Sequence, residues 1–138
     1  FINEMKQLYT MEIIHVNCKP VFHLEYALSK LKKEGYRMAV CSNSIRSTVE
    51  TMMEKSCLER YFEFYVSNED VSKGKPDPEM YIKAMAEMNL KPDQCMIIED
   101  NEKGIQAARA SGANVMIVDD VDSVNYLNIK ENIAMFER

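Results

Sequence analysis

Residues 95–118, CMIIEDNEKGIQAARASGANVMIV, decide the fold class of this chain. The apolar run at 96–98 predicts a buried strand, and the β-branched run at 114–118 predicts a second one. Between them, the alanine-rich stretch at 102–111 predicts a helix, which Gly112 closes. No hairpin signal separates the two strands, so they are expected to be parallel and joined by a helical crossover.

The same alternation of strand and helix extends toward the N-terminus. The runs RMAVC at 37–41 and FEFYV at 62–66 are short and rich in apolar residues, which predicts two further strands. Apolar residues three or four positions apart predict helices around these strands, with stripes at Leu24, Leu28 and Leu31, at Ile45, Val49 and Met52, and at Tyr81, Ile82 and Met85. The predicted class is therefore α/β, with a parallel sheet as the middle of three layers.

Composition narrows the possible functions. A chain of 138 residues with 46% hydrophobic residues can bury one core, so a single compact core is expected. Its formal net charge of -5 repels phosphodiester backbones and anionic lipid, which argues against nucleic acid and membrane surfaces as partners. No apolar stretch approaches the roughly 18 residues of a membrane span. The four cysteines form no CxxC pair, and Cys41 and Cys95 fall in expected strands, so a reduced, cytoplasmic location is expected.

Polar residues follow three of the expected strands. Ser42 and Asn43 end the first strand, Lys75 lies in the loop after the second, and Glu99 and Asp100 end the third. Because ligands bind beyond the carboxyl ends of parallel strands, we expect these side chains to surround one pocket. A hydroxyl and an amide can hold phosphate oxygens, an ammonium can neutralise them, and paired carboxylates suit a hard cation such as Mg²⁺. The two adjacent acids repel each other unless a cation or a lysine joins them.

Other polar residues near strand ends are expected to be structural. Asn101 suits the N-cap of the helix that follows it. Asp119 and Asp120 suit a polar turn that caps a helix. These three residues are therefore left outside the predicted site.

Three segments of the chain resemble motifs of a known enzyme family. They are AVCSNS, KGKPDP and IIEDNEKGIQAARASGA, which follow one another in this order. They are similar to the second, third and fourth motifs of the haloacid dehalogenase-type (HAD) hydrolases, in the subfamily of β-phosphoglucomutase and phosphoglycolate phosphatase. The resemblance runs from about residue 20 to residue 118 and implies a Rossmann-like core.

The resemblance implies a role for each candidate residue. Ser42 and Asn43 would bind the transferring phosphoryl group, and Lys75 would stabilise the charge of the nucleophile and the phosphate. Glu99 and Asp100 would hold Mg²⁺ as the cofactor. The family's reaction is an in-line attack by an aspartate, followed by hydrolysis or by transfer to a sugar hydroxyl.

One motif of the family is absent before Ser42. The first motif, Asp-x-Asp after an apolar strand, supplies the nucleophile and the general acid or base, yet no aspartate precedes Asp70 here. In the family this strand lies at the centre of the sheet, between the strands that correspond to those ending at Ser42 and Glu99. We therefore expect the sheet to lack its central strand.

The resemblance also predicts how the chain is divided. Residues 1–16, with apolar positions spaced as in an amphipathic helix over 2–14, correspond to a remnant of the family's helical cap. Residues 17–138 then form the core domain. An alternative is that EIIHV at 12–16 fills the central gap as a strand.

The leading hypothesis for function is a Mg²⁺-dependent phosphoryl-transfer hydrolase, a phosphatase on a small phosphorylated metabolite such as a sugar phosphate. Without an aspartate nucleophile, the chain as written is expected to be catalytically incomplete. One alternative is a non-catalytic phosphate- and metal-binding or regulatory module, and another is a mutase similar to β-phosphoglucomutase. A further alternative is an assembly domain, in which a second copy or a partner segment fills the missing strand.

Overall fold

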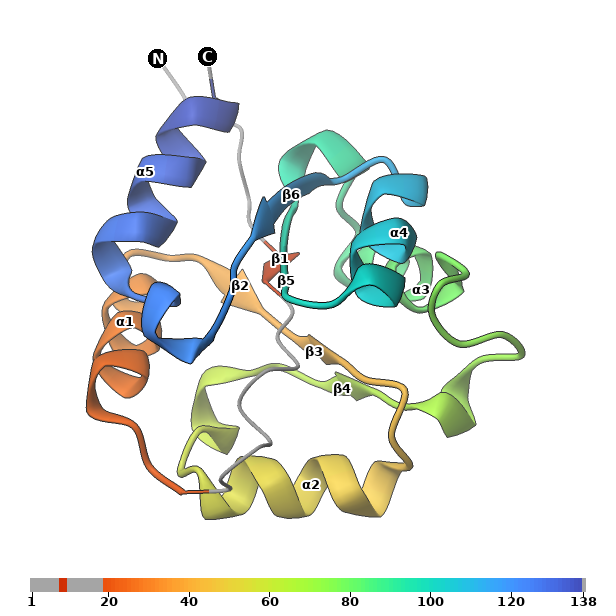
Figure 1. Ribbon diagram of the computed structural model, residues 1–138, viewed down its shortest axis with the longest axis horizontal. Helices are drawn as coiled ribbons and strands as arrows, with labels where there is room; N and C mark the ends of the chain where they lie inside the picture. The colour runs from red at the N-terminus through yellow and green to blue at the C-terminus, as the bar shows by residue number, and fades with distance from the viewer. Residues whose placement is uncertain (1–7, 10–18, 138) are drawn as a thin grey trace.

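The structure is a computed structural model that describes residues 8–9 and 19–137 (Figure 1). Short strands alternate with helices along this part of the chain: β1 (Leu8–Tyr9), α1 (Phe22–Lys33), β2 (Arg37–Met38), β3 (Val40–Cys41), α2 (Arg46–Lys55), β4 (Tyr65–Val66), α3 (Glu79–Met88), β5 (Met96–Glu99), α4 (Glu102–Ala110), β6 (Asn114–Ile117) and α5 (Tyr126–Phe136). This order of elements is that of the predicted α/β class.

Every strand pair in the described part of the chain is parallel. β1 pairs with β2, β3 pairs with β4, and β5 pairs with β6. Only Ala39 separates β2 from β3, so residues 37–41 form one extended segment that bonds to β1 at its start and to β4 at its end. β1 also contacts β5, which places it between the two halves of the sheet (Figure 1).

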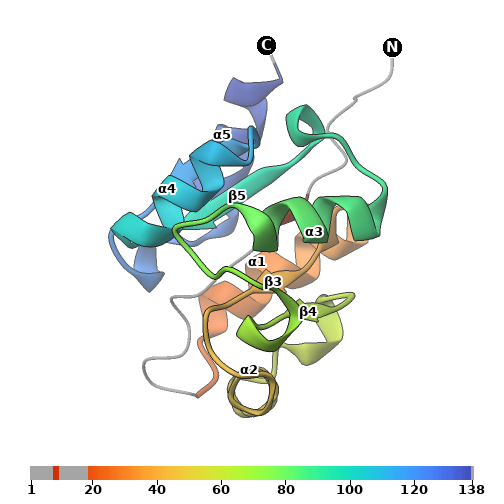
Figure 2. The ribbon, with the colours of Figure 1, turned by 90° about the vertical axis from the view of Figure 1, so that its right-hand side faces the viewer.

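Both faces of the strands are buried, as expected for a middle layer. Val40 and Ile98 belong to one apolar core together with side chains of α1, α2 and α5. Their neighbours Cys41 and Ile97 belong to a second core with side chains of α3 and α4. Figure 1 shows α1 and α5 on one side of the strands and α3 and α4 on the other, and Figure 2 shows α3 in front of β3 with α1 behind it. The predicted three layers are therefore present.

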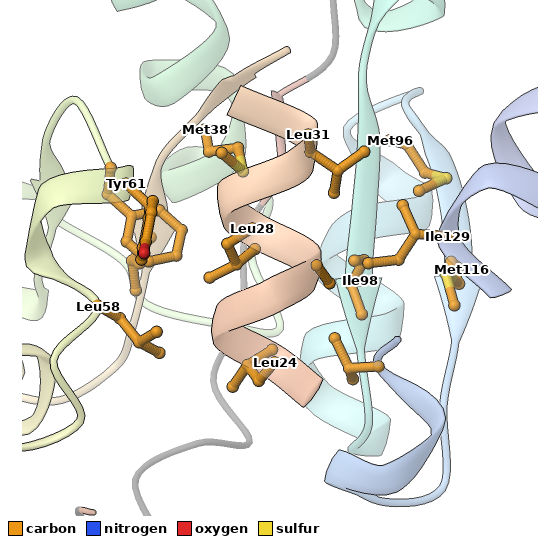
Figure 3. Close-up of a cluster of buried hydrophobic side chains, with 14 of the residues drawn as sticks. Leu24, Leu28, Leu31, Met38, Leu58, Tyr61, Met96, Ile98, Met116 and Ile129 are labelled. Atoms are coloured by element: carbon orange, nitrogen blue, oxygen red, sulfur yellow. The ribbon is translucent and has the colours of Figure 1, made fainter. Parts of the chain in front are cut away.

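Helix α1 supplies the centre of the first core. Leu24, Leu28 and Leu31 are buried and lie on one face of the helix. Figure 3 shows this face between Tyr61 on one side and Met96 on the other. Burying one leucine side chain contributes about 1.5–3 kcal/mol, so packing holds α1 on the sheet. The apolar stripe predicted for this helix is confirmed.

The N-terminal segment differs from the prediction at the residues that the structure describes. Leu8 and Tyr9 fall inside the predicted amphipathic helix over 2–14, but they form a strand that pairs with Arg37 and Met38. The predicted helix is wrong at these two residues, because pairing with a neighbouring strand overrides local periodicity. The remainder of that helix, and the alternative strand at 12–16, lie outside the described residues.

β1 stands in the place where we expected the sheet to lack a strand. It is two residues long, and neither Leu8 nor Tyr9 is acidic, so no Asp-bearing strand lies at this position of the described chain. The break in the sheet between β2 and β5 is therefore narrower than expected. The family's first motif, Asp-x-Asp, is absent from the residues before Ser42. The division into a cap remnant at 1–16 and a core domain at 17–138 stays a prediction.

The structure bears on two of the features considered from composition. Cys41 and Cys95 are buried, as predicted from the apolar runs in which they lie. Among the helices of the described residues, none combines the length and the apolar character that crossing a membrane requires. A cytoplasmic location stays a prediction.

Candidate active site

The ends of separate strands meet at the side chain of Lys75. Its Nζ lies 2.9 Å from the backbone oxygen of Cys41, at the end of β3, and 2.6 Å from Oε2 of Glu99, at the end of β5. Ser42, which follows Cys41, is buried at this edge of the sheet. The structure thus brings Ser42, Lys75 and Glu99 to one edge, as the positions of their motifs predict. Their chemical roles stay predictions.

The loop that carries Lys75 is fixed at its start by the first residue of α3. Oε2 of Glu79 accepts the backbone N–H of Ser72 at 3.0 Å, and Oε1 accepts that of Lys73 at 2.9 Å. These two N–H groups hold the pKa of Glu79 below its usual range. Asp77 accepts the N–H of Glu79 in turn, so the loop and the start of α3 hold each other.

Asn43 binds the backbone of Lys75 with both ends of its amide. Oδ1 accepts the Lys75 N–H at 2.9 Å, and Nδ2 donates to the Lys75 carbonyl at 3.2 Å. The neighbouring Gly74 leaves room for this amide, since a Cβ there would stand 2.6 Å from Oδ1 of Asn43. The side chain of Asn43 therefore positions Lys75 in this structure, whereas we predicted that it binds phosphate. A phosphate role for its amide stays a prediction.

Lys75, Glu99 and Tyr81 form a buried group that we call the site triad. The Lys75 and Glu99 side chains are 2% and 1% exposed, and Nζ lies 5.0 Å from the centre of the Tyr81 ring. The Tyr81 hydroxyl donates a hydrogen bond to Oε2 of Glu99, the same oxygen that pairs with Lys75. Removing one member of a buried ion pair leaves an uncompensated charge and costs about 3–5 kcal/mol, so the members of the triad depend on one another.

Tyr81 is the site residue that the sequence analysis missed. It was predicted only as part of the apolar stripe of its helix, and it is indeed fully buried in the second core. The signal that could have found it is the residue type. A buried tyrosine needs a partner for its hydroxyl, whereas phenylalanine fills the same space without one.

The second oxygen of Glu99, Oε1, differs from Oε2 in its surroundings. Oε1 is buried and has no hydrogen-bond partner among the described residues. It lies against α4, where a Cβ on Gly104 would stand 2.1 Å from Oε1 and from the carboxyl carbon. Glycine at this position therefore makes room for the Glu99 carboxylate.

Ser42 is positioned by the sheet and by its own loop. Its N–H donates to the carbonyl of Val66 at 2.9 Å, which continues the β3–β4 ladder by one residue. Its hydroxyl oxygen accepts the N–H of Ser44 at 3.1 Å. A hydroxyl in this place keeps its proton for donation, so it can hydrogen-bond to an anion.

Asp100 is the remaining candidate for a metal ligand. Lys75 already supplies a positive charge to Oε2 of Glu99. Oε1 is therefore the oxygen of Glu99 that can accept a further partner. Asp100 is half-buried, and no cluster of three or more His, Cys, Asp or Glu side chains in the described chain could hold a metal ion. Mg²⁺ is often bound by one or two carboxylates, completed by water and substrate phosphate. The residues fit a site of that kind, and the metal roles of Glu99 and Asp100 stay predictions.

Two of the three polar residues predicted to be structural cap a helix. Oδ1 of Asn101 accepts the N–H of Gly104 at 2.8 Å and caps α4. The Asp120 side chain accepts the N–H of Ser123 at 3.2 Å and caps the short 3-10 helix Val121–Ser123. Asp119 is exposed beside it. These caps confirm the interpretation of both segments.

A comparison with family models identifies the class of the chain. Residues 1–118 match the model described as haloacid dehalogenase-like hydrolase. The chain belongs to this family.

Curated relatives are similar over part of their length. A bifunctional riboflavin kinase/FMN phosphatase of Arabidopsis thaliana is 32% identical over 102 residues, which cover 70% of this chain and 26% of the relative. A phosphorylated carbohydrates phosphatase of Thermotoga maritima is 29% identical over 86 residues, which cover 62% of this chain and 40% of the relative. The chain therefore corresponds to less than half of each relative.

A solved structure shows the same fold. A Thermotoga maritima protein assigned as a β-phosphoglucomutase superposes with a TM-score of 0.73 at 21% identity, over 79% of this chain and 59% of that one. At this identity the likeness concerns the fold alone. It confirms the α/β class and the HAD-like core that the motifs implied.

Proposed function

We propose that this chain carries the phosphate- and metal-binding part of a Mg²⁺-dependent phosphatase that acts on a small phosphorylated metabolite. The observation that carries the proposal is the buried ammonium of Lys75, held between the ends of β3 and β5. Related chains include a phosphatase of phosphorylated carbohydrates and an FMN phosphatase, which supports a phosphomonoester of a small molecule as the ligand.

Each residue at the sheet edge has one task in this proposal. The Ser42 hydroxyl donates a hydrogen bond to a phosphate oxygen, and the charge of Lys75 stabilises the phosphate in a site that excludes water. Glu99 and the Asn43 amide hold Lys75 in place. Asp100 would hold Mg²⁺, which neutralises charge on the phosphate oxygens when bound.

Turnover needs a nucleophile that the described residues do not place at this edge. Asp100 is the aspartate of the predicted site, and its proposed task is to hold the metal. We propose that an aspartate from a further segment, in the same protein or in a partner, completes the site, because positioning and electrostatics do not replace an absent nucleophile.

The test is the binding of inorganic phosphate in the presence of Mg²⁺, measured by titration calorimetry. Ser42→Ala and Asp100→Asn are each expected to weaken phosphate binding about tenfold, the effect of losing one contact to a charged group. Ser47→Ala and Asp93→Asn are the matched controls, because both residues are exposed and Asp93 precedes β5, at the opposite end of that strand from Asp100. Absence of phosphate binding by the unmodified chain, or equal losses in the controls, would contradict the proposal.

A second candidate is a phosphate- and metal-binding module without catalysis. The specific observation in its favour is β1, which contacts β5 and pairs with β2 yet has no acidic residue. Hydrolysis of an aryl phosphate with Mg²⁺ separates the two candidates. Phosphate binding without turnover, even when an Asp-bearing segment is supplied, favours the module. Turnover by this chain alone at an ordinary enzymatic rate, lost in Glu99→Ala, would show that it has a nucleophile of its own.

A further inference from the structure

We propose that Tyr81 is a positioning residue of this site: its hydroxyl fixes the Glu99 carboxylate so that Oε2 holds Lys75 while the carboxyl group stays packed against Gly104 of α4. This inference rests on the proposed function, because it concerns the same phosphate-binding lysine. It assigns to a residue of the apolar core a task that packing does not require.

The first argument is the uneven use of the two oxygens of Glu99. Lys75 and Tyr81 both donate to Oε2, whereas Oε1 is buried without a partner among the described residues. A carboxylate that is free to rotate would share its two donors between its two oxygens. Two donors on the same oxygen fix the orientation of the group.

The second argument is the place of Tyr81 in α3. The residue is fully buried, and its neighbours in the second core are apolar side chains of α3 and α4. A phenylalanine would fill this space without placing a hydroxyl in the core. The hydroxyl therefore serves its acceptor, Glu99, and not the packing of the helix.

The third argument is that Tyr81 touches both members of the ion pair. Its hydroxyl donates to Glu99, and its ring lies 5.0 Å from Nζ of Lys75. The face of an aromatic ring attracts an ammonium. The Tyr81 ring, the Glu99 carboxylate and the Cys41 carbonyl together hold the Lys75 ammonium in place. Its positive charge therefore lies at the ends of β3 and β5.

The chain contains a matched control, which we call the surface triad: Arg60, Glu25 and Tyr61. The Tyr61 hydroxyl donates to Oε2 of Glu25 at 3.1 Å, Arg60 pairs with the same oxygen, and the Arg60 guanidinium lies 4.7 Å from the ring centre of Tyr61. Tyr61 is 6% exposed, so its ring is packed almost as tightly as the ring of Tyr81. A substitution by phenylalanine therefore removes the hydroxyl from a buried ring in both cases. Tyr61→Phe therefore makes the same chemical change as Tyr81→Phe, away from Lys75.

The experiment follows the ammonium of Lys75 by NMR in protein that contains ¹⁵N-labelled lysine. The signal is assigned by its loss in Lys75→Arg. In Tyr81→Phe we expect the signal to shift and its exchange with water to become about tenfold faster, as for the loss of a hydrogen bond to a charged group. In Tyr61→Phe the signal should stay unchanged. Backbone amide spectra confirm that both variants are folded.

Titration with inorganic phosphate and Mg²⁺ is the second measurement. Tyr81→Phe should bind phosphate more weakly than the unmodified chain, and Tyr61→Phe should bind it equally well. An unchanged Lys75 signal in Tyr81→Phe, or an equal change in Tyr61→Phe, would overturn the positioning role even if phosphate binds. A Lys75 signal that responds only to Tyr81→Phe supports the positioning role even where the unmodified chain binds no phosphate, and that result contradicts the proposed function alone.

Discussion

The site triad and the surface triad have the same chemistry in opposite surroundings. In each, a tyrosine hydroxyl donates to a glutamate that pairs with a cation near the tyrosine ring. The Lys75 and Glu99 side chains are 2% and 1% exposed, whereas those of Arg60 and Glu25 are 62% and 31% exposed. Water and salt can replace the partners of the surface triad, whereas they have little access to the site triad.

This difference in burial indicates why the site triad is present. A buried ion pair costs several kcal/mol of desolvation per ion, and apolar side chains of the same size often stabilise a core as well or better. The site triad is therefore a poor way to stabilise the layer between β3 and β5. Its presence at the strand ends is better explained by what Lys75 does there than by what it adds to folding.

The largest effect expected from this comparison is that of Lys75→Met. The variant leaves Glu99 buried without its cation, so the free energy of unfolding should fall by about 3–5 kcal/mol, measured by urea denaturation. The control is Lys73→Met, because Lys73 is exposed in the same loop. It should change stability by less than about 0.5 kcal/mol.

A double variant sharpens the same prediction. Lys75→Met combined with Glu99→Gln removes both charges and keeps an acceptor for Tyr81. It should be more stable than Lys75→Met alone, because no buried charge is left unpaired. Additive losses in the double variant would mean that the two side chains do not depend on each other.

A smaller loss is expected for Gly104→Ala. In most helix interiors this change stabilises by up to about 1 kcal/mol. Here the new Cβ would stand 2.1 Å from the carboxyl group of Glu99, which Lys75 and Tyr81 hold in place, so we expect a net loss of about 1–3 kcal/mol. In a Glu99→Ala background the sign should reverse. If Gly104→Ala is destabilising in both backgrounds, the carboxylate is not what the glycine accommodates.

The fold could be predicted where short segments carry the information. Apolar runs at 37–41 and 96–98 and the Gly112 helix end are local signals, and the structure has strands and a helix end at these places. β1 and α5 could not be predicted in the same way. β1 is two residues long, and its pairing depends on the neighbouring β2; α5 begins at Tyr126 with the sequence YLNIKENIAMF, whose asparagines weaken the helical pattern.

The site could be predicted only in part, for a similar reason. The strand ends brought Ser42, Lys75 and Glu99 together because parallel strands end at one edge of a sheet. Which atoms bind one another depends on side-chain geometry, which sequence spacing does not contain. The Asn43 amide was expected to face a ligand, yet it binds the Lys75 backbone, and Tyr81 was hidden in an apolar stripe.

The smallest effect is expected for Arg60→Met, which breaks the surface triad at its cation. The Arg60 side chain is 62% exposed, so the free energy of unfolding should fall only slightly at low salt, by less than in Lys75→Met or Gly104→Ala. Part of even this loss comes from the contact between the guanidinium and the Tyr61 ring. Urea denaturation at low salt and at about 1 M salt distinguishes the two contributions, because salt screens exposed charges. A salt-independent loss as large as that of Lys75→Met would show that burial is not what separates the two triads.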